Sequence, residues 1–125
     1  MNAAAERLLV DVALPVPLPG AFTYRWTPDV AATAPRPGDL VRVPFGRRRG
    51  LIGLVLAVRD DPDAITSVGG APLRDLAAVL PAGYRITGER LAVARWLAAY
   101  YAVELGEVVP LFHPPRPGTR GRRPR

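Results

Sequence analysis

The stretch LLVDVALPVPLPGAFTYRW, residues 8–26, predicts two β-strands and the connector between them. In residues 8–14, apolar side chains at every second position alternate with Leu9, Asp11 and Ala13, which is the period-two pattern of a strand with one better-buried face. Prolines at positions 15, 17 and 19 lack the backbone N–H that a sheet requires, so an extended connector follows, ending at Gly20. Residues 21–26 form the second strand, with Phe22, Tyr24 and Trp26 on one side.

Downstream of this stretch, the sequence predicts a hairpin with a basic tip. PRPGD at 35–39 is typical of a turn into a third strand, residues 40–45. GRRRG at 46–50 joins that strand to the apolar run 51–58, and its glycines suit a turn that needs positive φ. Gly53 inside the run indicates a bulge or a close backbone approach. Residues 73–80 fit a strand or a short helix, and the many preceding strands favour the strand.

Residues 91–101 predict a helix, because they lack Pro and Gly and are rich in Ala and Leu. Thr87 is a candidate N-cap, and Gly106 is a candidate stop. The i, i+3, i+4, i+7 spacing predicts a largely buried helix, with Tyr100 and Tyr101 packing between helix and sheet. That spacing is formed by Val93, Trp96, Leu97 and Tyr100.

We therefore expect an α+β fold, in which a small bent antiparallel β-sheet or partial barrel is followed by a short helical lobe. The expected domain covers residues 1–113, with a β-rich part at 8–80 and the helical lobe at 87–103. Residues 114–125, rich in Arg and Pro, read as a tail or a truncated linker.

The net charge of +6 belongs mostly to this tail. All 17 basic residues are arginines and five of them lie in residues 114–125, so the body carries 12 Arg against 11 acidic residues. A local basic run remains in the body at Arg47, Arg48 and Arg49. The charge alone therefore gives weak support for nucleic-acid binding.

Several classes of function lack their required residues. Cysteine is absent, which excludes disulfides and thiolate metal sites, and the start of the chain resembles neither a signal peptide nor a membrane span. The only His, His113, lies at the edge of the tail and is a poor candidate for catalysis. Without lysine there is no phosphate-binding GxxxxGK[ST] loop. We expect no enzyme, no cofactor and no metal in this fragment.

Three segments carry a family resemblance: VALPVPLPGAFTY, GDLVRVPFGRRRGLIGLV and WLAAYYAVELGEVV. In this order, from about Val10 to Pro110, they resemble the amino-terminal region of the primosomal protein N′ family, the replication-restart helicases called PriA. The resemblance implies a non-catalytic module that captures the 3′ end of the leading strand at a stalled or branched replication fork. A helicase domain would follow in the same longer chain.

The resemblance also implies a pocket for the terminal nucleotide. Phe22 corresponds to the family's aromatic residue that stacks on a base, and Gly46 to the glycine that lets a nucleotide approach the backbone. Thr23 stands where the family typically has Asp, so a hydroxyl replaces a stronger acceptor. Arg74 stands where the family usually has Lys and keeps a charge for phosphate. Arg47, Arg48 and Arg49 are weaker candidates for contacts with the DNA backbone.

The implied partners are branched or forked DNA with a 3′ end, the downstream helicase domain, single-strand-binding protein and replicative-helicase loading factors. The resemblance also implies a cytoplasmic, nucleoid-associated location in bacteria, and no membrane partner is expected. Two alternatives remain open: a general RNA- or ribosome-binding barrel, and a protein-interaction module with exposed apolar residues. Without the family resemblance, the stripe of Phe22, Tyr24 and Trp26 is more typical of a buried face of a sheet than of a binding surface.

Overall fold

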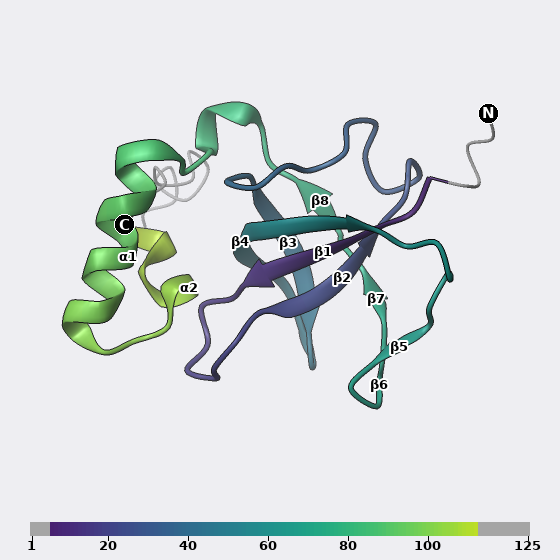
Figure 1. Cartoon of the computed structure of the whole chain (residues 1–125), viewed down its shortest axis with the longest axis horizontal. Helices are drawn as coiled ribbons and strands as arrows, with labels where there is room; N and C mark the ends of the chain where they lie inside the picture. Colours follow the sequence, from purple (N-terminus) through teal and green to yellow (C-terminus); the bar gives the residue numbers. More distant parts are fainter. Residues whose placement is uncertain (1–5, 113–125) are drawn as a thin grey trace, which may run out of the picture.

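The computed structural model describes residues 6–112 and contains one curled, six-stranded sheet with a helical lobe at one end (Figure 1). The strand order in the sheet is β7-β2-β1-β4-β3-β8. Its long strands are β1 (Leu8–Ala13), β2 (Phe22–Trp26), β3 (Leu40–Phe45) and β4 (Arg48–Asp60). The expected α+β class is confirmed.

The first two strands form where the sequence predicts them. β1 and β2 pair antiparallel, with Val10 opposite Tyr24 and Asp11 opposite Thr23. Tyr24 and Trp26 are buried, so this part of the aromatic stripe does belong to the core. The proline-rich connector between the strands lies outside the sheet, as expected for residues that cannot donate to a ladder.

The hairpin of β3 and β4 is shorter at its tip than the sequence suggests. Arg48 and Arg49 belong to β4 and pair with Phe45 and Pro44, so only residues 46 and 47 form the turn. The close approach predicted at Gly53 is confirmed, because a Cβ there would lie 2.9 Å from the carbonyl oxygen of Ala13.

Residues 73–80 contain two short strands on opposite edges of the sheet. β7 (Arg74–Asp75) pairs with β2, and β8 (Ala78–Val79) pairs with β3. The pairing of β7 with β2 is parallel, so the sheet is mixed and not purely antiparallel. Only residues 76 and 77 separate the two strands, and three residue steps reach at most about 11 Å. The sheet must therefore curl until its edges nearly meet, which is the expected partial barrel.

A second, smaller hairpin precedes this closure at the end of the sheet far from the helices (Figure 1). It consists of β5 (Ser67–Val68) and β6 (Ala71–Pro72), which pair antiparallel. Its turn is formed by Gly69 and Gly70, which have φ of 58° and 84°. Two consecutive residues with positive φ are typical of a tight hairpin turn and favour glycine.

Neighbouring residues in the central strands belong to two different hydrophobic cores. The first core, inside the curl of the sheet, includes Val12, Val41 and Val55. The second, on the side of the helical lobe, contains Ala13, Leu40 and Leu54 together with Ile86 and Val109. Because successive side chains of a strand point to opposite faces, these strands are covered on both sides, and their sequences are nearly continuous apolar runs.

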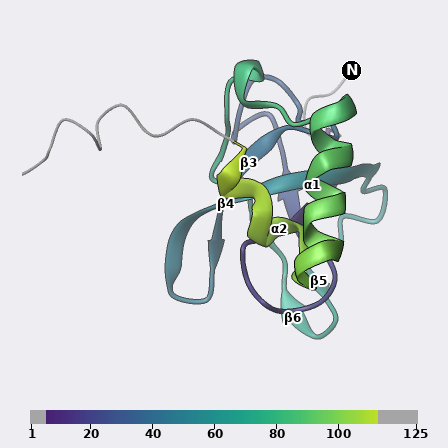
Figure 2. The same ribbon diagram turned by 90° about the vertical axis from the view of Figure 1, so that its left-hand side faces the viewer.

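The helical lobe covers one end of the sheet (Figure 2). It contains α1 (Gly88–Tyr101) and α2 (Leu105–Val108), with single turns of 3-10 helix at Ala82–Tyr84 and Val109–Leu111. Thr87 is the N-cap residue of α1, as predicted, although its side chain makes no capping hydrogen bond. None of the helices in residues 6–112 is both long and apolar enough to cross a membrane. His113 and the tail 114–125 lie outside the described residues.

The prediction that α1 is largely buried is wrong. Its buried residues are Ala94 and Ala98, which pack close to Val108 of α2. Trp96, Tyr100 and Tyr101 are 61–67% exposed, so the two tyrosines do not pack between helix and sheet. The rings of Trp96 and Tyr100 stack on each other, with centroids 5.1 Å apart. Small alanines permit the close approach of α2, and the helix presents only this narrow face to the fold.

Gly106 does not end a helix, which corrects a second expectation. α1 ends at Ala102, whose left-handed φ of 55° breaks the helical path. Gly106 instead lies within α2 and faces the backbone of Leu14, so closely that a Cβ would overlap the Leu14 carbonyl group. The absence of a side chain is therefore what allows α2 to pack on the end of β1.

Replacing Gly106 with alanine tests this packing. We expect Gly106→Ala to cost about 1–3 kcal/mol, because the added methyl group must displace backbone atoms. The thermal midpoint should then fall by roughly 5–20 °C in a scan followed by circular dichroism. Gly83→Ala is the matched control, since Gly83 has nothing within 4 Å of the added Cβ. Equal midpoints for the two variants would contradict the close approach.

Candidate nucleic-acid-binding site

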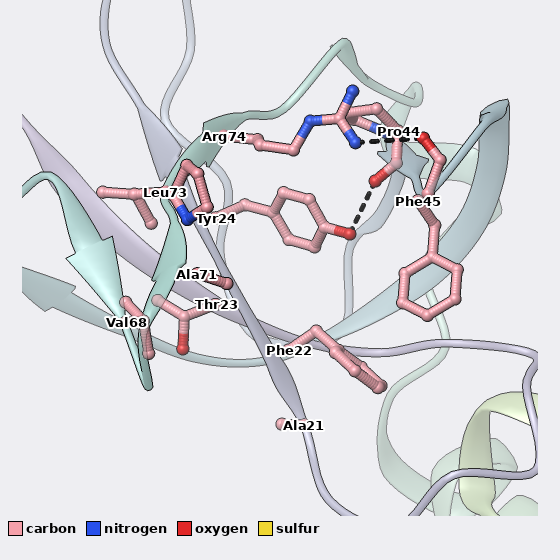
Figure 3. Close-up of a pocket in the computed structure, with 12 residues that line it drawn as sticks. Ala21, Phe22, Thr23, Tyr24, Pro44, Phe45, Val68, Ala71, Leu73 and Arg74 are labelled. Atoms are coloured by element: carbon pink, nitrogen blue, oxygen red, sulfur yellow. Dashed lines mark hydrogen bonds between the residues drawn. The ribbon is translucent and has the colours of Figure 1, made fainter.

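A pocket of about 240 Å³ opens where the curl of the sheet closes (Figure 3). Three segments line it: residues 21–24 on and before β2, residues 44–46 at the end of β3, and Val68 with residues 71–74 from β6 to β7. Phe22, Thr23, Gly46 and Arg74, the four pocket residues expected from the family resemblance, all lie on its wall. The structure thus brings together residues that are up to 52 positions apart in the sequence.

Aromatic rings form one side of the pocket. Phe22 is half-buried and meets Phe45 edge to face, with ring centroids 5.2 Å apart and planes at 78°. Such pairs hold both rings in fixed orientations, which suits a stacking surface. Phe45 was not identified from the sequence as a pocket residue, although it lies in the RVPFG motif beside Gly46.

Tyr24 lines the pocket and joins two of its segments. Its side chain is buried, and its hydroxyl donates a hydrogen bond of 2.7 Å to the carbonyl oxygen of Pro44. This bond joins β2 to the end of β3, where Gly46 follows. Burial raises the pKa of Tyr24 above its usual value of 10.0, while the positive charge of Arg74 opposes the shift.

Arg74 and Gly46 form the rim. The Nη1 group of Arg74 donates to the carbonyl oxygen of Gly46 at 3.3 Å, which places an exposed guanidinium over the pocket (Figure 3). A guanidinium has five N–H donors, so this one bond leaves donors for an anion. Gly46 has a φ of 58°, and nothing lies within 4 Å of the position that its Cβ would occupy. Its backbone is therefore open to a ligand.

Thr23 is tied to a residue that the sequence analysis did not assign to the site. Its hydroxyl donates to Oδ1 of Asp11 at 2.8 Å. Asp11 also accepts two bonds from Arg59, of 2.6 Å from Nη2 and 3.2 Å from Nε. The bond to Asp11 raises the pKa of Arg59, against a smaller opposing effect of burial. A lone acidic residue in the middle of an apolar strand is the sequence signal that points to Asp11.

Arg47 and Arg48 at the tip of the β3–β4 hairpin do not line the pocket, although Gly46 of its turn does. Arg47 in the turn and Arg48 at the start of β4 are both exposed. Figure 2 shows this hairpin projecting from the body of the fold. The side chain of Arg49 lies outside the described part of the structure. A role of these arginines in DNA contact therefore remains a prediction.

Comparison with known families gives a match over most of the chain. The family model of the PriA 3′DNA-binding domain (3′BD) matches residues 11–114. This range includes all four expected pocket residues.

Two curated replication restart proteins are similar in sequence to this chain. The replication restart protein PriA of Rickettsia felis is 36% identical over 77 residues, which are 62% of this chain and 11% of the relative. That of Rickettsia conorii is 32% identical over 77 residues, with the same shares. The chain thus corresponds to a small part of these relatives' length.

The support that Tyr24 gives to the pocket can be tested by pH. The raised pKa means that folding favours the protonated phenol, so its contribution is complete below about pH 10 and is lost as the pH rises through the folded-state pKa. We expect Tyr24→Phe to lower the free energy of unfolding by about 0.5–1.5 kcal/mol at pH 7. Urea titrations should also show a smaller loss of stability between pH 9 and pH 11.5 than in the unaltered chain. Tyr101→Phe, at an exposed position, should change neither quantity, and an equal alkaline loss in both variants would contradict the assignment.

Proposed function

The chain belongs to the PriA 3′DNA-binding domain family, and from that premise we propose that this DNA-binding module holds the 3′-terminal nucleotide of a DNA strand in the pocket between β2, β3 and β7. The strand is the leading strand at a stalled or branched replication fork. The module itself binds and does not catalyse.

The observation that carries this proposal is the convergence of Phe22, Thr23, Gly46 and Arg74 around one pocket. Each supplies a different part of nucleotide recognition. The ring of Phe22 can stack on any base, for which single-strand binders gain about 1–3 kcal/mol per base. The open backbone at Gly46 admits the sugar, and Arg74 supplies a cation for phosphate.

The size of the pocket favours binding of the end of a DNA strand over binding of a longer stretch of it. Its volume of about 240 Å³ is below the range of roughly 300–1,000 Å³ typical of sites for drug-sized ligands. A single terminal base with part of its sugar suits such a space. The rest of the affinity would come from phosphate contacts outside the pocket, for which Arg47, Arg48 and Arg49 are the candidates.

We also propose the context in which the module works. The matched region is 11% of the relatives' length, so a helicase that follows in the same longer protein is a proposal and not a property of this chain. Single-strand-binding protein and helicase-loading factors are proposed partners of that longer protein. Residues 1–113 are proposed as the folded domain, and 114–125 as a tail or a truncated linker.

Binding of matched forked DNAs tests the function. In fluorescence anisotropy, we expect a fork with a 3′-hydroxyl at the leading-strand end to bind more tightly than one with a 3′-phosphate or an RNA of equal length. Phe22→Leu keeps apolar volume but removes the ring, and should weaken binding to the 3′-hydroxyl fork by about 5- to 150-fold. Tyr101→Leu, which removes an exposed ring that does not line the pocket, should leave the affinity unchanged.

Two results would contradict the proposal. Equal binding of all three nucleic acids would remove end recognition and favour a general nucleic-acid-binding barrel. A greater loss on deletion of residues 116–125 than on Phe22→Leu, at moderate salt, would assign the affinity to the tail.

A further inference from the structure

The side chain at position 23 creates a problem for end recognition. A threonine hydroxyl is both a donor and an acceptor of hydrogen bonds. A free hydroxyl could accept a bond from a 3′-hydroxyl or donate one to a 3′-phosphate, so it would distinguish the two ends poorly. A carboxylate at this position would only accept.

Asp11 removes this ambiguity in the structure. It lies directly opposite Thr23 in the register of β1 and β2, and it accepts the Thr23 proton at 2.8 Å. Arg59 holds both oxygens of the same carboxylate, with bonds of 2.6 Å and 3.2 Å. The Asp11 side chain is only 20% exposed, so the carboxylate is fixed and partly shielded from water.

We propose that Asp11 is a positioning residue for end selection. By taking the proton of Thr23, it leaves only the lone pairs of Oγ1 for the ligand, so Thr23 accepts a hydrogen bond from the terminal 3′-hydroxyl. This inference rests on the proposed function. Asp11 and Thr23 together then do what one carboxylate at position 23 would do.

The same arrangement disfavours a 3′-phosphate for two reasons. An ionised phosphate has no proton to offer to the lone pairs of Thr23, and its charge would approach the carboxylate of Asp11. The pairing of Asp11 with Arg59 reduces this repulsion but does not supply a proton. Selectivity should therefore depend mainly on the hydrogen bond and only partly on charge.

A purely structural role for Asp11 makes a different prediction. Cross-strand pairs of this kind stabilise sheets, and their loss would weaken the fold and the binding of every DNA alike. A positioning role instead changes the ratio of the dissociation constants for 3′-phosphate and 3′-hydroxyl DNA. This ratio is the quantity to measure.

The test compares this ratio, obtained by anisotropy with the same pair of forks, among single and double variants. We expect Asp11→Ala and Thr23→Val each to lower the ratio by about 3- to 10-fold, the effect of one hydrogen bond. Adding Asp11→Ala to Thr23→Val should lower it little further, because the shared hydrogen bond is already lost and only the smaller effect of charge remains. Adding Thr23→Asp to Asp11→Ala should restore the ratio by placing a carboxylate directly at the pocket.

The matched control is Asp75→Ala. Asp75 also pairs with an arginine of the neighbouring strand, at 2.6 Å from Nε of Arg25, but it does not contact Thr23. Its loss should leave the ratio unchanged.

The possible failures separate the two proposals. A ratio near one in the unaltered chain would contradict the proposed function itself. Two other results would overturn the role of Asp11 alone. In the first, the unaltered chain prefers the 3′-hydroxyl fork and Asp11→Ala keeps the same ratio of dissociation constants. In the second, Asp11→Ala loses the same affinity for both forks.

Discussion

The backbone amides of Leu76 and Ala77 donate hydrogen bonds to strands on opposite sides of the curled sheet. Leu76 binds the carbonyl oxygen of Arg25 on β2 at 3.0 Å, and Ala77 binds that of Arg42 on β3 at 2.8 Å. Because two neighbouring residues bind β2 and β3, these strands, which are not adjacent in the order of the sheet, are held close together. Phe22, Gly46 and Arg74 meet only because of this closure, so the pocket depends on backbone geometry before it depends on any side chain.

In the proposed function, the pocket divides recognition among groups of different chemistry. An aromatic edge, an open stretch of backbone and a guanidinium surround the pocket, and none of them distinguishes one base from another. Such a set suits a module that must recognise the end of a strand whatever its sequence. The network of Thr23, Asp11 and Arg59, which we propose distinguishes one end group from another, reaches across three strands, β2, β1 and β4.

Much of the fold could be predicted from local patterns in the sequence. The alternation in residues 8–14, the prolines at 15, 17 and 19 and the glycines near 46–50 gave two strands and a hairpin, because each depends on short-range backbone constraints. The closure at residues 76 and 77 could not be predicted from the sequence. Strands of two residues are too short to show an alternation of apolar side chains, and their pairing partners lie far away in the sequence. The exposed face of α1 was missed because aromatic side chains at helical spacing indicate a core, while the contact surface is made by alanines. Asp11 was missed because its partner is set by strand register, which alternation alone leaves open.

In the proposed function, the strand end sits in the pocket between β2, β3 and β7. Amide chemical-shift mapping by NMR, with a short single-stranded oligonucleotide that ends in a 3′-hydroxyl, can locate the bound end. We expect the largest shifts at the non-proline residues among 21–24, 44–46 and 71–74, and much smaller ones when the same oligonucleotide ends in a 3′-phosphate. Shifts confined to Arg47 and Arg48 or to α1, with the pocket amides unmoved, would show that the strand end binds elsewhere.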